Sequence, residues 1–285
     1  MKIGKFLPGK LGNRSQTIPV VRLAGMIAAG GGPLSSSRLS LASCASSLER
    51  AFSFKKAPVV AISVNSPGGS PVQSRLIYSR IRKLAEEKEK KVIMFVEDVA
   101  ASGGYMIALA GDEIIADDTS IVGSIGVVSA GFGFDKAIAK LGVDRRVYTA
   151  GKNKVMLDPF QAEKKTDITY LKELQLEIHQ VFIDMVADRR EGKLAEDKDI
   201  FTGKFWTGTR AHQLGLVDGL GHMSNVLKER FGDDIELKLV QPKRGLFGRA
   251  APGVGGLLSQ DTVETLADGL INVAEERALR ARYGL

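Results

Sequence analysis

A serine followed by two glycines, Ser102-Gly103-Gly104, is the stretch of this 285-residue chain best suited to chemistry. It lies between an apolar run, Val92–Val96, and a stretch of helical character, Tyr105–Ala110, which predicts a strand-to-helix junction. Small residues there allow a substrate or another backbone to approach closely. The N-terminus of a helix also offers unpaired N–H groups to a developing oxyanion. Taken alone, the pattern fits a capping serine in a tight turn as well as a nucleophile.

A second glycine-containing loop, residues 65–70, has the same position in its own unit. It follows a predicted strand, Pro58–Val64, and precedes a predicted helix, Val72–Lys90. Loops at the carboxyl ends of parallel strands gather at one edge of the sheet, where ligands bind. The loop matches neither a P-loop nor a dinucleotide-binding fingerprint. We therefore expect it to meet the Ser102 loop and to supply backbone N–H groups there.

A serine nucleophile needs a general base, and the sequence offers histidines and lysines. The three histidines, His179, His212 and His222, are expected on a helix surface or at turns and caps. A lysine can act as a base when burial lowers its pKa from about 10.4 toward neutrality. Lys152 and Lys154 point to the same side of an extended segment, and the apolar residues that follow Lys154 favour it. The residues alone leave this choice open.

Composition bounds the class of protein. The apolar fraction of 44% and the charged fraction of 26% are ordinary for a globular protein. The net charge of +7 is scattered and aromatic residues are few, which argues against nucleic-acid binding. The one cysteine, Cys44, excludes an intramolecular disulfide and a cysteine-rich metal site, and we expect it to be a packing residue. No metal or cofactor is expected.

Apolar runs and helical patterns alternate along the chain, which predicts an α/β fold with a parallel sheet. Further strands are expected at Ile18–Ile27, Glu113–Ala116, Thr119–Ser129 (a strand or extended segment), Val143–Thr149 and Ile235–Val240. Further helices are expected at Leu34–Phe54 on the surface, Phe134–Leu141, Ile168–Arg190, within Phe201–Asp218, and at Met223–Phe231.

Composition and apolar patterning divide the chain into four parts. Residues 1–16 read as a flexible basic arm, 17–240 as the main domain, 241–260 as a Gly/Pro-rich basic linker and 261–285 as an amphipathic helix. The start lacks the apolar core of a signal peptide, and no run is long enough to span a bilayer. We therefore expect a cytoplasmic protein, or one lying peripherally at the inner membrane.

Several motifs occur together and in a fixed order: VNSPGG, DVAASGGYMIALAGDEIIAD, TSIVGSIGVV, YTAGKNKVMLDPF and TGKFWTGTRAHQLGLVDGLG. This set resembles the S49 serine peptidases, the group of signal peptide peptidase A and SohB, over roughly residues 18–240. The resemblance implies the crotonase-like fold shared with ClpP, a spiral of ββα units. Many members begin with a transmembrane anchor and the long forms carry a tandem duplication; in this chain we expect neither.

The resemblance also implies roles for particular residues. Ser102 matches the nucleophile of a Ser/Lys dyad, Lys154 the general base, and Ser124 a serine that orients the lysine. The matching oxyanion hole combines Gly68 or Gly69 with the N–H of Gly103. Glu97 and Asp98, the acids near Ser102, are then expected to be structural or solvated.

The expected function is ATP-independent serine endopeptidase activity on short, unfolded, largely apolar peptides such as signal peptide remnants. The resemblance implies a homo-oligomeric ring; the C-terminal helix could dock on a neighbouring subunit or contact a membrane surface. Two alternatives remain open: a crotonase-like acyl-CoA hydratase or isomerase using Glu97 and Asp98, and a catalytically inactive scaffold associated with membrane proteins.

Overall fold

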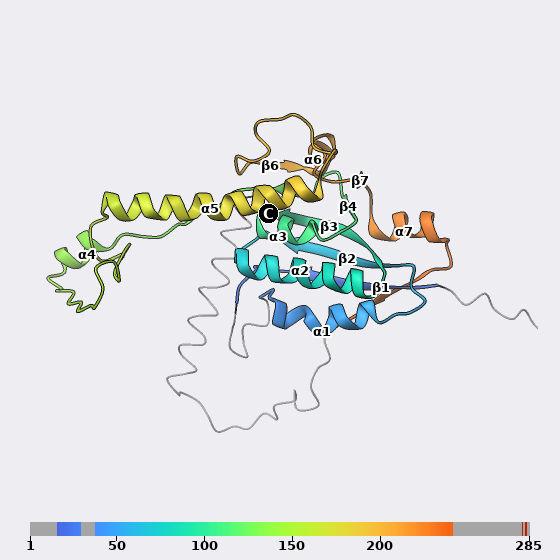
Figure 1. Ribbon diagram of the computed structural model, residues 1–285, viewed down its shortest axis with the longest axis horizontal. Coiled ribbons are helices and arrows are strands. Elements are labelled where there is room, and N and C mark those ends of the chain that lie inside the picture. Colours follow the sequence, from blue (N-terminus) through green and yellow to red (C-terminus); the bar gives the residue numbers. More distant parts are fainter. Residues whose placement is uncertain (1–15, 30–37, 242–280, 282, 284–285) are drawn as a thin grey trace, which may run out of the picture.

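Within the described residues, eight strands form one sheet, and helices pack on both of its faces (Figure 1). The computed structural model describes residues 16–29, 38–241, 281 and 283. The strands are β1 (Thr17–Ala24), β2 (Val59–Ser66), β3 (Lys91–Ala101), β4 (Glu113–Ala116), β5 (Ile121–Gly123), β6 (Phe205–Thr207), β7 (Gly219–Leu220) and β8 (Glu236–Leu239). The helices are α1 (Leu41–Phe52), α2 (Pro71–Glu87), α3 (Gly103–Ala108), α4 (Asp135–Lys140), α5 (Lys165–Arg189), α6 (Gly208–Gln213) and α7 (Met223–Phe231). The predicted α/β fold with a mostly parallel sheet is confirmed.

The long strand β3 organises the sheet, whose order is β6-β5-β3-β2-β1-β8. Along one edge, β3 pairs first with β4 through residues 93–96 and then with β5 through residues 99–101. The pairing of β3 with β2 is irregular between these two parts. Val96 pairs with Val64 and Ala100 pairs with Ser66, so three residues of β3 lie opposite one residue of β2. The extra residues of this bulge include Glu97 and Asp98, and bulges re-aim a strand. After the bulge, the last residues of β3, immediately before Ser102, pair with β5.

Alternate residues of the central strands face two different apolar layers. Val60, Ile62 and Val64 of β2 join the layer that contains α1, α2 and α3. Val59 and Ala61 join the layer that contains Leu227 of α7. Because both faces are covered, these strands read as continuous apolar runs rather than as alternating ones.

Local signals place the first two helices. Ser40 and Ser43 form a reciprocal capping box at the start of α1. Ser70 caps α2, and Pro71 occupies its first turn, where the missing N–H costs nothing. Helix α1 is more buried than a surface helix: Leu48, at 0% exposed, lies in the core beside Cys44. Burial raises the pKa of the Cys44 thiol to about 12, in keeping with a packing role.

The long helix α5 projects from the domain as an arm (Figure 1). Only Phe182 and Val186, near its C-terminal end, are buried. The other large apolar residues of α5 are partly or fully exposed, including Leu174, Ile178 and Val181. Helix α4 lies near the far end of this arm and has no buried residue. We call residues 127–181 the arm.

One predicted strand is wrong. Residues 143–149 form no strand and lie exposed on the arm. Val143 and Val147 supply the apolar alternation of a strand, but a strand needs a neighbour to satisfy its backbone, and none is paired with this segment. Residues 1–15 of the basic arm, 242–260 of the linker and 261–280 of the C-terminal helix lie outside the described residues. None of the described helices has the length and apolarity needed to cross a bilayer.

Candidate active site

Ser102 occupies a strained turn between β3 and α3. Its backbone has φ +51° and ψ −121°, a conformation that is rare for any residue other than glycine. Its N–H donates to the Gly123 carbonyl over 2.8 Å and its carbonyl accepts from the Met106 N–H over 3.0 Å, which holds both sides of the turn. The residue is half-buried. Strain maintained by surrounding bonds is typical of functional sites and of serine nucleophiles on strand-to-helix turns.

The two glycine loops meet, as predicted from the parallel sheet. A Cβ added to Gly68 would lie 2.8 Å from the Ser102 Cβ and 3.1 Å from the Gly103 nitrogen. A Cβ on Gly103 would lie within contact of the Ser74 Oγ, and one on Gly104 would run into the Ser66 carbonyl. These positions admit no side chain, because backbone from one loop packs directly on backbone from the other.

The N–H groups of Gly69 and Gly103, beside Ser102, have no hydrogen-bond acceptor among the described residues. A Cβ on Gly103 would lie 3.5 Å from the Gly69 nitrogen, so the two glycines are neighbours. The Gly68 N–H, by contrast, donates to the Ser66 Oγ over 3.2 Å. Of the two glycines that the sequence left open, the geometry therefore favours Gly69 as the oxyanion donor alongside Gly103.

Ser124 lines the same cleft as Ser102. It has a left-handed backbone, φ +54°, and is 5% exposed. Its N–H donates to the Lys204 carbonyl over 2.7 Å, and this anchors the segment that follows β5. The preceding residue, Gly123, bonds the Ser102 N–H, so the two serines are held by adjacent backbone groups.

A cleft of about 620 Å³ opens at these residues. Ser102, Ser124 and Gly69 line it, together with His179 of α5 and Tyr283 near the end of the chain. The structure thus brings together in one cleft the predicted nucleophile, the predicted orienting serine and Gly69, one of the predicted oxyanion glycines.

The candidate lysines lie elsewhere in this chain. Lys152 and Lys154 are exposed on the arm. The Leu157 N–H donates to the Asp167 Oδ2 over 3.4 Å, which ties their segment to the first turn of α5. From Asp167 to His179, which lines the cleft, the helix runs about 18 Å at 1.5 Å per residue. A lysine side chain with four methylene groups is too short to cover that span.

The histidines do not form a triad with Ser102 in the described structure. His179 lies in the cleft wall, but its Nε2 is 3.0 Å from the Ile125 carbonyl. A carbonyl only accepts, so this nitrogen carries the hydrogen and is not free to take a proton from serine. His212 is exposed, and His222 lines a different cleft, near Asp117.

The acids Glu97 and Asp98 also line that second cleft and not the one at Ser102. Two hydrogen bonds of 2.9 and 2.6 Å join the Arg22 guanidinium to the two oxygens of Glu97, and the Asn65 amide donates to Asp98 over 2.6 Å. Burial raises the Glu97 pKa, but the bonds from Arg22 and from Ser63 and Asn65 outweigh it and hold that pKa below its ordinary value. Glu97 is thus paired with a charge and Asp98 is hydrogen-bonded to an amide, and these contacts join β1, β2 and β3.

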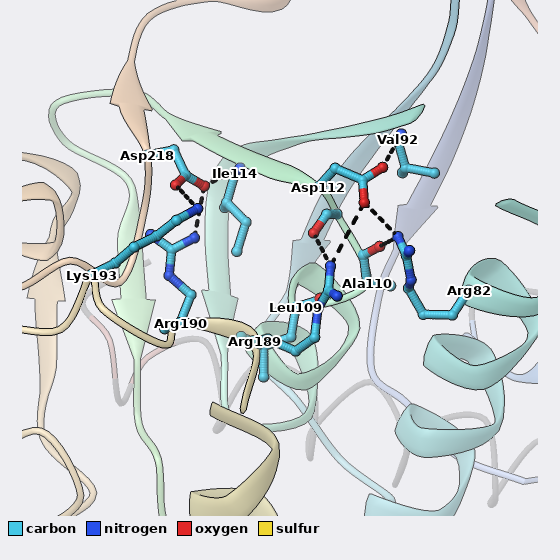
Figure 2. Close-up of polar contacts among 11 residues, drawn as sticks. Arg82, Val92, Leu109, Ala110, Asp112, Ile114, Arg189, Arg190, Lys193 and Asp218 are labelled. Carbon is cyan, nitrogen blue, oxygen red and sulfur yellow. Dashed lines mark hydrogen bonds and ion pairs between the residues drawn. The ribbon is translucent and has the colours of Figure 1, made fainter. Parts of the chain in front are cut away.

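Two arginines at the C-terminal end of α5 form hydrogen bonds and ion pairs with neighbouring segments of the domain (Figure 2). Arg189 donates to the carbonyls of Leu109 and Gly111, just after α3, over 3.0 and 2.7 Å. Arg190, 3% exposed, pairs with Asp218 over 2.7 Å, and Asp218 also accepts from the Ile114 N–H. Through Arg189, the C-terminal end of α5 is therefore bound to the end of α3, the helix that follows Ser102.

Replacing Asp218 by Asn should lower the free energy of unfolding by about 3 kcal/mol, because the charge of Arg190 would be left buried and unpaired. Burial raises the Asp218 pKa, but hydrogen bonds from Arg190 and Lys193 hold it below its ordinary value. The stabilisation is thus complete above the unfolded pKa of about 3.9 and is lost as the pH falls through the lower folded value. Urea unfolding should show a constant difference between wild type and variant from about pH 5 to 8, narrowing below about pH 4.

The control is Asp233→Asn, which removes an exposed carboxylate with no partner among the described residues and should change stability by less than about 0.5 kcal/mol. An Asp218→Asn variant as stable as this control would show that the ion pair between Arg190 and Asp218 does not stabilise the fold.

Sequence reasoning missed one occupant of the cleft, Tyr283, and the strand that supports it, β6. The pattern of residues 261–285 indicated only an amphipathic helix, and nothing local to Tyr283 points to the distant Ser124. Strand β6 has three residues and pairs antiparallel with β5, too short a run for periodicity to reveal.

Taken together, the mostly parallel sheet, the strained turn at Ser102 and the glycine N–H groups beside it define an α/β protein with a candidate active site at the end of β3. The chain belongs to peptidase family S49: the family profile matches residues 84–232. The match includes Ser102, Ser124 and Lys154 but begins after Gly69. The predicted membership in this family of serine peptidases is confirmed.

Individual relatives differ in length from this chain. The Na(+)/H(+) antiporter NhaA of Brucella abortus is 62% identical over 99% of this chain, which spans 39% of that protein. The chloroplastic serine protease SPPA of Arabidopsis thaliana is 33% identical over 79% of this chain, and the match covers 33% of that protein. A solved structure of a mutant membrane-bound stomatin-specific protease, 1510-N, is similar over 80% of this chain and 99% of its own, with 16% identity and a TM-score of 0.49.

Proposed function

We propose that this chain is an ATP-independent serine endopeptidase with Ser102 as the nucleophile. The observation that carries the proposal is the strained Ser102 turn, which lies in the cleft beside the N–H groups of Gly69 and Gly103, for which the described residues supply no acceptor. Attack of the Ser102 Oγ on a peptide carbonyl would place the oxyanion against these two donors. Preorganised donors of this kind are worth about 10²- to 10³-fold in rate each.

The proposed base is Lys154, acting on the Ser102 of a second copy of the chain. A neutral lysine amine takes the Ser102 proton as the Oγ–C bond forms, and returns it to the leaving amine as the peptide C–N bond breaks. A water molecule, deprotonated by the same amine, then hydrolyses the acyl-enzyme. In this proposal the Ser124 hydroxyl holds the amine during both steps.

A second copy is invoked because the arm carries Lys154 away from its own cleft. Most of the exposed large apolar side chains among the described residues lie on this arm, including Phe132, Tyr148, Tyr170 and Leu176, which are 51 to 91% exposed. Contiguous exposed apolar surface marks an interaction site. Contact between copies would cover this surface and bring a lysine to a cleft whose described lining contains none. If each copy contacts the next in this head-to-tail way and the last copy contacts the first, the copies form a ring.

The tip of the arm has an organised structure of its own, as a docking element requires. The rings of Phe134 and Phe160 stack with centroids 5.5 Å apart, and the Phe134 N–H donates to the Pro159 carbonyl over 2.6 Å. Arg145 pairs with Asp158 over 2.8 Å. Lys154 is therefore presented from a folded unit whose shape is set before any partner binds.

The proposed substrates are short, unfolded, largely apolar peptides, signal peptide remnants among them. An open cleft beside strands β3 and β5, lined by Gly69, Val127 and Val128, suits an extended peptide backbone with apolar side chains. The acyl-CoA hydratase or isomerase alternative loses its support, since its candidate acids lie in the second cleft.

A fluorophosphonate probe tests the nucleophile. Wild type should gain one adduct, located on the Ser102 peptide by mass spectrometry, while Ser102→Ala should gain none. The control Ser79→Ala, which changes an exposed serine of α2, should label like wild type. Failure to label wild type would support the inactive-scaffold alternative, and labelling that persists in Ser102→Ala would place the nucleophile elsewhere.

A further inference from the structure

Ile27, three residues beyond the end of β1, lies against both glycines of the candidate oxyanion hole. The residue is 1% exposed and bridges to Gly69 on one side and to Leu39 on the other. A Cβ on Gly69 would collide with the Ile27 carbonyl, and a Cβ on Gly103 would lie 3.3 Å from the Ile27 Cδ1. One buried residue thus borders the two segments that offer N–H groups beside Ser102.

The backbone of Ile27 sets the direction of the Gly69 N–H. The Ile27 N–H donates to the Gly68 carbonyl over 2.8 Å, and the Ile27 carbonyl accepts from the Ser70 N–H over 2.7 Å. The peptide bond between Gly68 and Gly69 is trans, so its carbonyl and its N–H point in opposite directions. Because the Gly68 carbonyl points at Ile27, the Gly69 N–H points away from Ile27. It is thereby left for a ligand in the cleft that Gly69 lines.

Ile27 is itself held from its other side. The Ala28 N–H donates to the Leu39 carbonyl over 3.0 Å, and the Leu39 N–H donates to the Met26 carbonyl over 2.9 Å. The segment around Ile27 is therefore hydrogen-bonded on both edges, as a central strand is. A shift of this segment would break bonds to both neighbours, so it gives the Gly69 loop a fixed reference.

The side chain of Ile27 supports the second donor. Ile27 belongs to the apolar layer that also contains α3, and its Cδ1 lies under Gly103, the first residue of that helix. When a buried methyl group is removed, its neighbours relax partly into the space it leaves. Loss of the Cδ1 would therefore let the Gly103 N–H move relative to the Gly69 N–H. The strength of an oxyanion hole depends on such distances.

We propose that Ile27 is a positioning residue for the oxyanion hole. Its backbone directs the Gly69 N–H into the cleft, and its Cδ1 methyl group sets the place of the Gly103 N–H. Ile27 acts through the two glycines and does not itself touch the substrate. The inference rests on the proposed function, in which both N–H groups bind the oxyanion that forms when Ser102 attacks a peptide carbonyl.

Ile27→Val tests this role, because the substitution removes the Cδ1 methyl group and keeps the backbone and the β-branched shape. The matched control is Ile62→Val, which removes the same group from a 0% exposed residue of the same apolar layer. A fluorophosphonate places its phosphoryl oxygen in the oxyanion hole as Ser102 attacks. The rate constant for labelling should fall about tenfold in Ile27→Val and stay within about twofold of wild type in Ile62→Val.

Steady-state kinetics on a cleavable peptide separate positioning from binding. In Ile27→Val, kcat should fall by the same factor of about ten while KM stays within about twofold, because the hole binds the oxyanion more strongly than the ground state. Urea unfolding should give the two variants the same midpoint, since each loses one buried methyl group.

Labelling of Ile27→Val as fast as that of Ile62→Val would overturn the positioning role and leave Ile27 as a packing residue. A raised KM with unchanged kcat would also overturn it, because substrate binding and not the oxyanion would then depend on Ile27. Absence of labelling in wild type is a different result: it would remove the proposed nucleophile, and the positioning role with it.

Discussion

Replacing Lys154 by Ala is expected to lower kcat/KM on an unfolded peptide by about 10⁴-fold, because the Ser102 proton would have no acceptor. The matched control is Lys152→Ala, since both lysines are exposed on the same turn of the arm. It should retain activity within about twofold, the effect of a surface charge. A quenched-fluorescence peptide read at neutral pH gives both values, and thermal unfolding should be unchanged in both variants.

The pair of variants separates the two lysines that sequence physics could not distinguish. Loss of activity in Lys152→Ala with retention in Lys154→Ala would move the base by two residues along the arm. If both variants retain activity, neither lysine is the base, and His179, which lines the cleft, becomes the next candidate.

Much of the sheet could be predicted because its strands are buried on both faces. Runs such as Pro58–Val64 and Val92–Val96 had to be central strands, since their uninterrupted apolar character requires cover on two sides. From a parallel sheet it followed that loops after neighbouring strands would meet. The contact of Gly68 with Ser102 was predictable for that reason alone.

The exposed parts of the chain were predicted less well. The spacing of the apolar residues in Ile168–Arg190 is typical of a helix with one buried face, yet only the C-terminal end of α5 reaches the core. Apolar periodicity shows that a face is covered, but it does not say whether the cover comes from the same chain or from another copy. The same ambiguity made residues 143–149 resemble a strand.

The remaining gaps concern contacts between residues far apart in the chain. The bulge at Glu97 and Asp98 depends on how β2 and β3 register, and Arg22 pairs with Glu97 from a strand that precedes both. Tyr283 reaches Ser124 from the last residues of the chain. Pairings of this kind arise from tertiary packing, which local propensity and periodicity do not encode.

The central claim is that a working site combines Ser102 of one copy with Lys154 of another, and mixed oligomers test it most directly. Ser102→Ala and Lys154→Ala chains with different tags are co-expressed, and oligomers carrying both tags are isolated. Each variant alone should be inactive, whereas in a random mixture about one site in four joins an intact serine to an intact lysine. The account predicts roughly a quarter of wild-type activity. Doubly tagged oligomers no more active than either variant alone would contradict it.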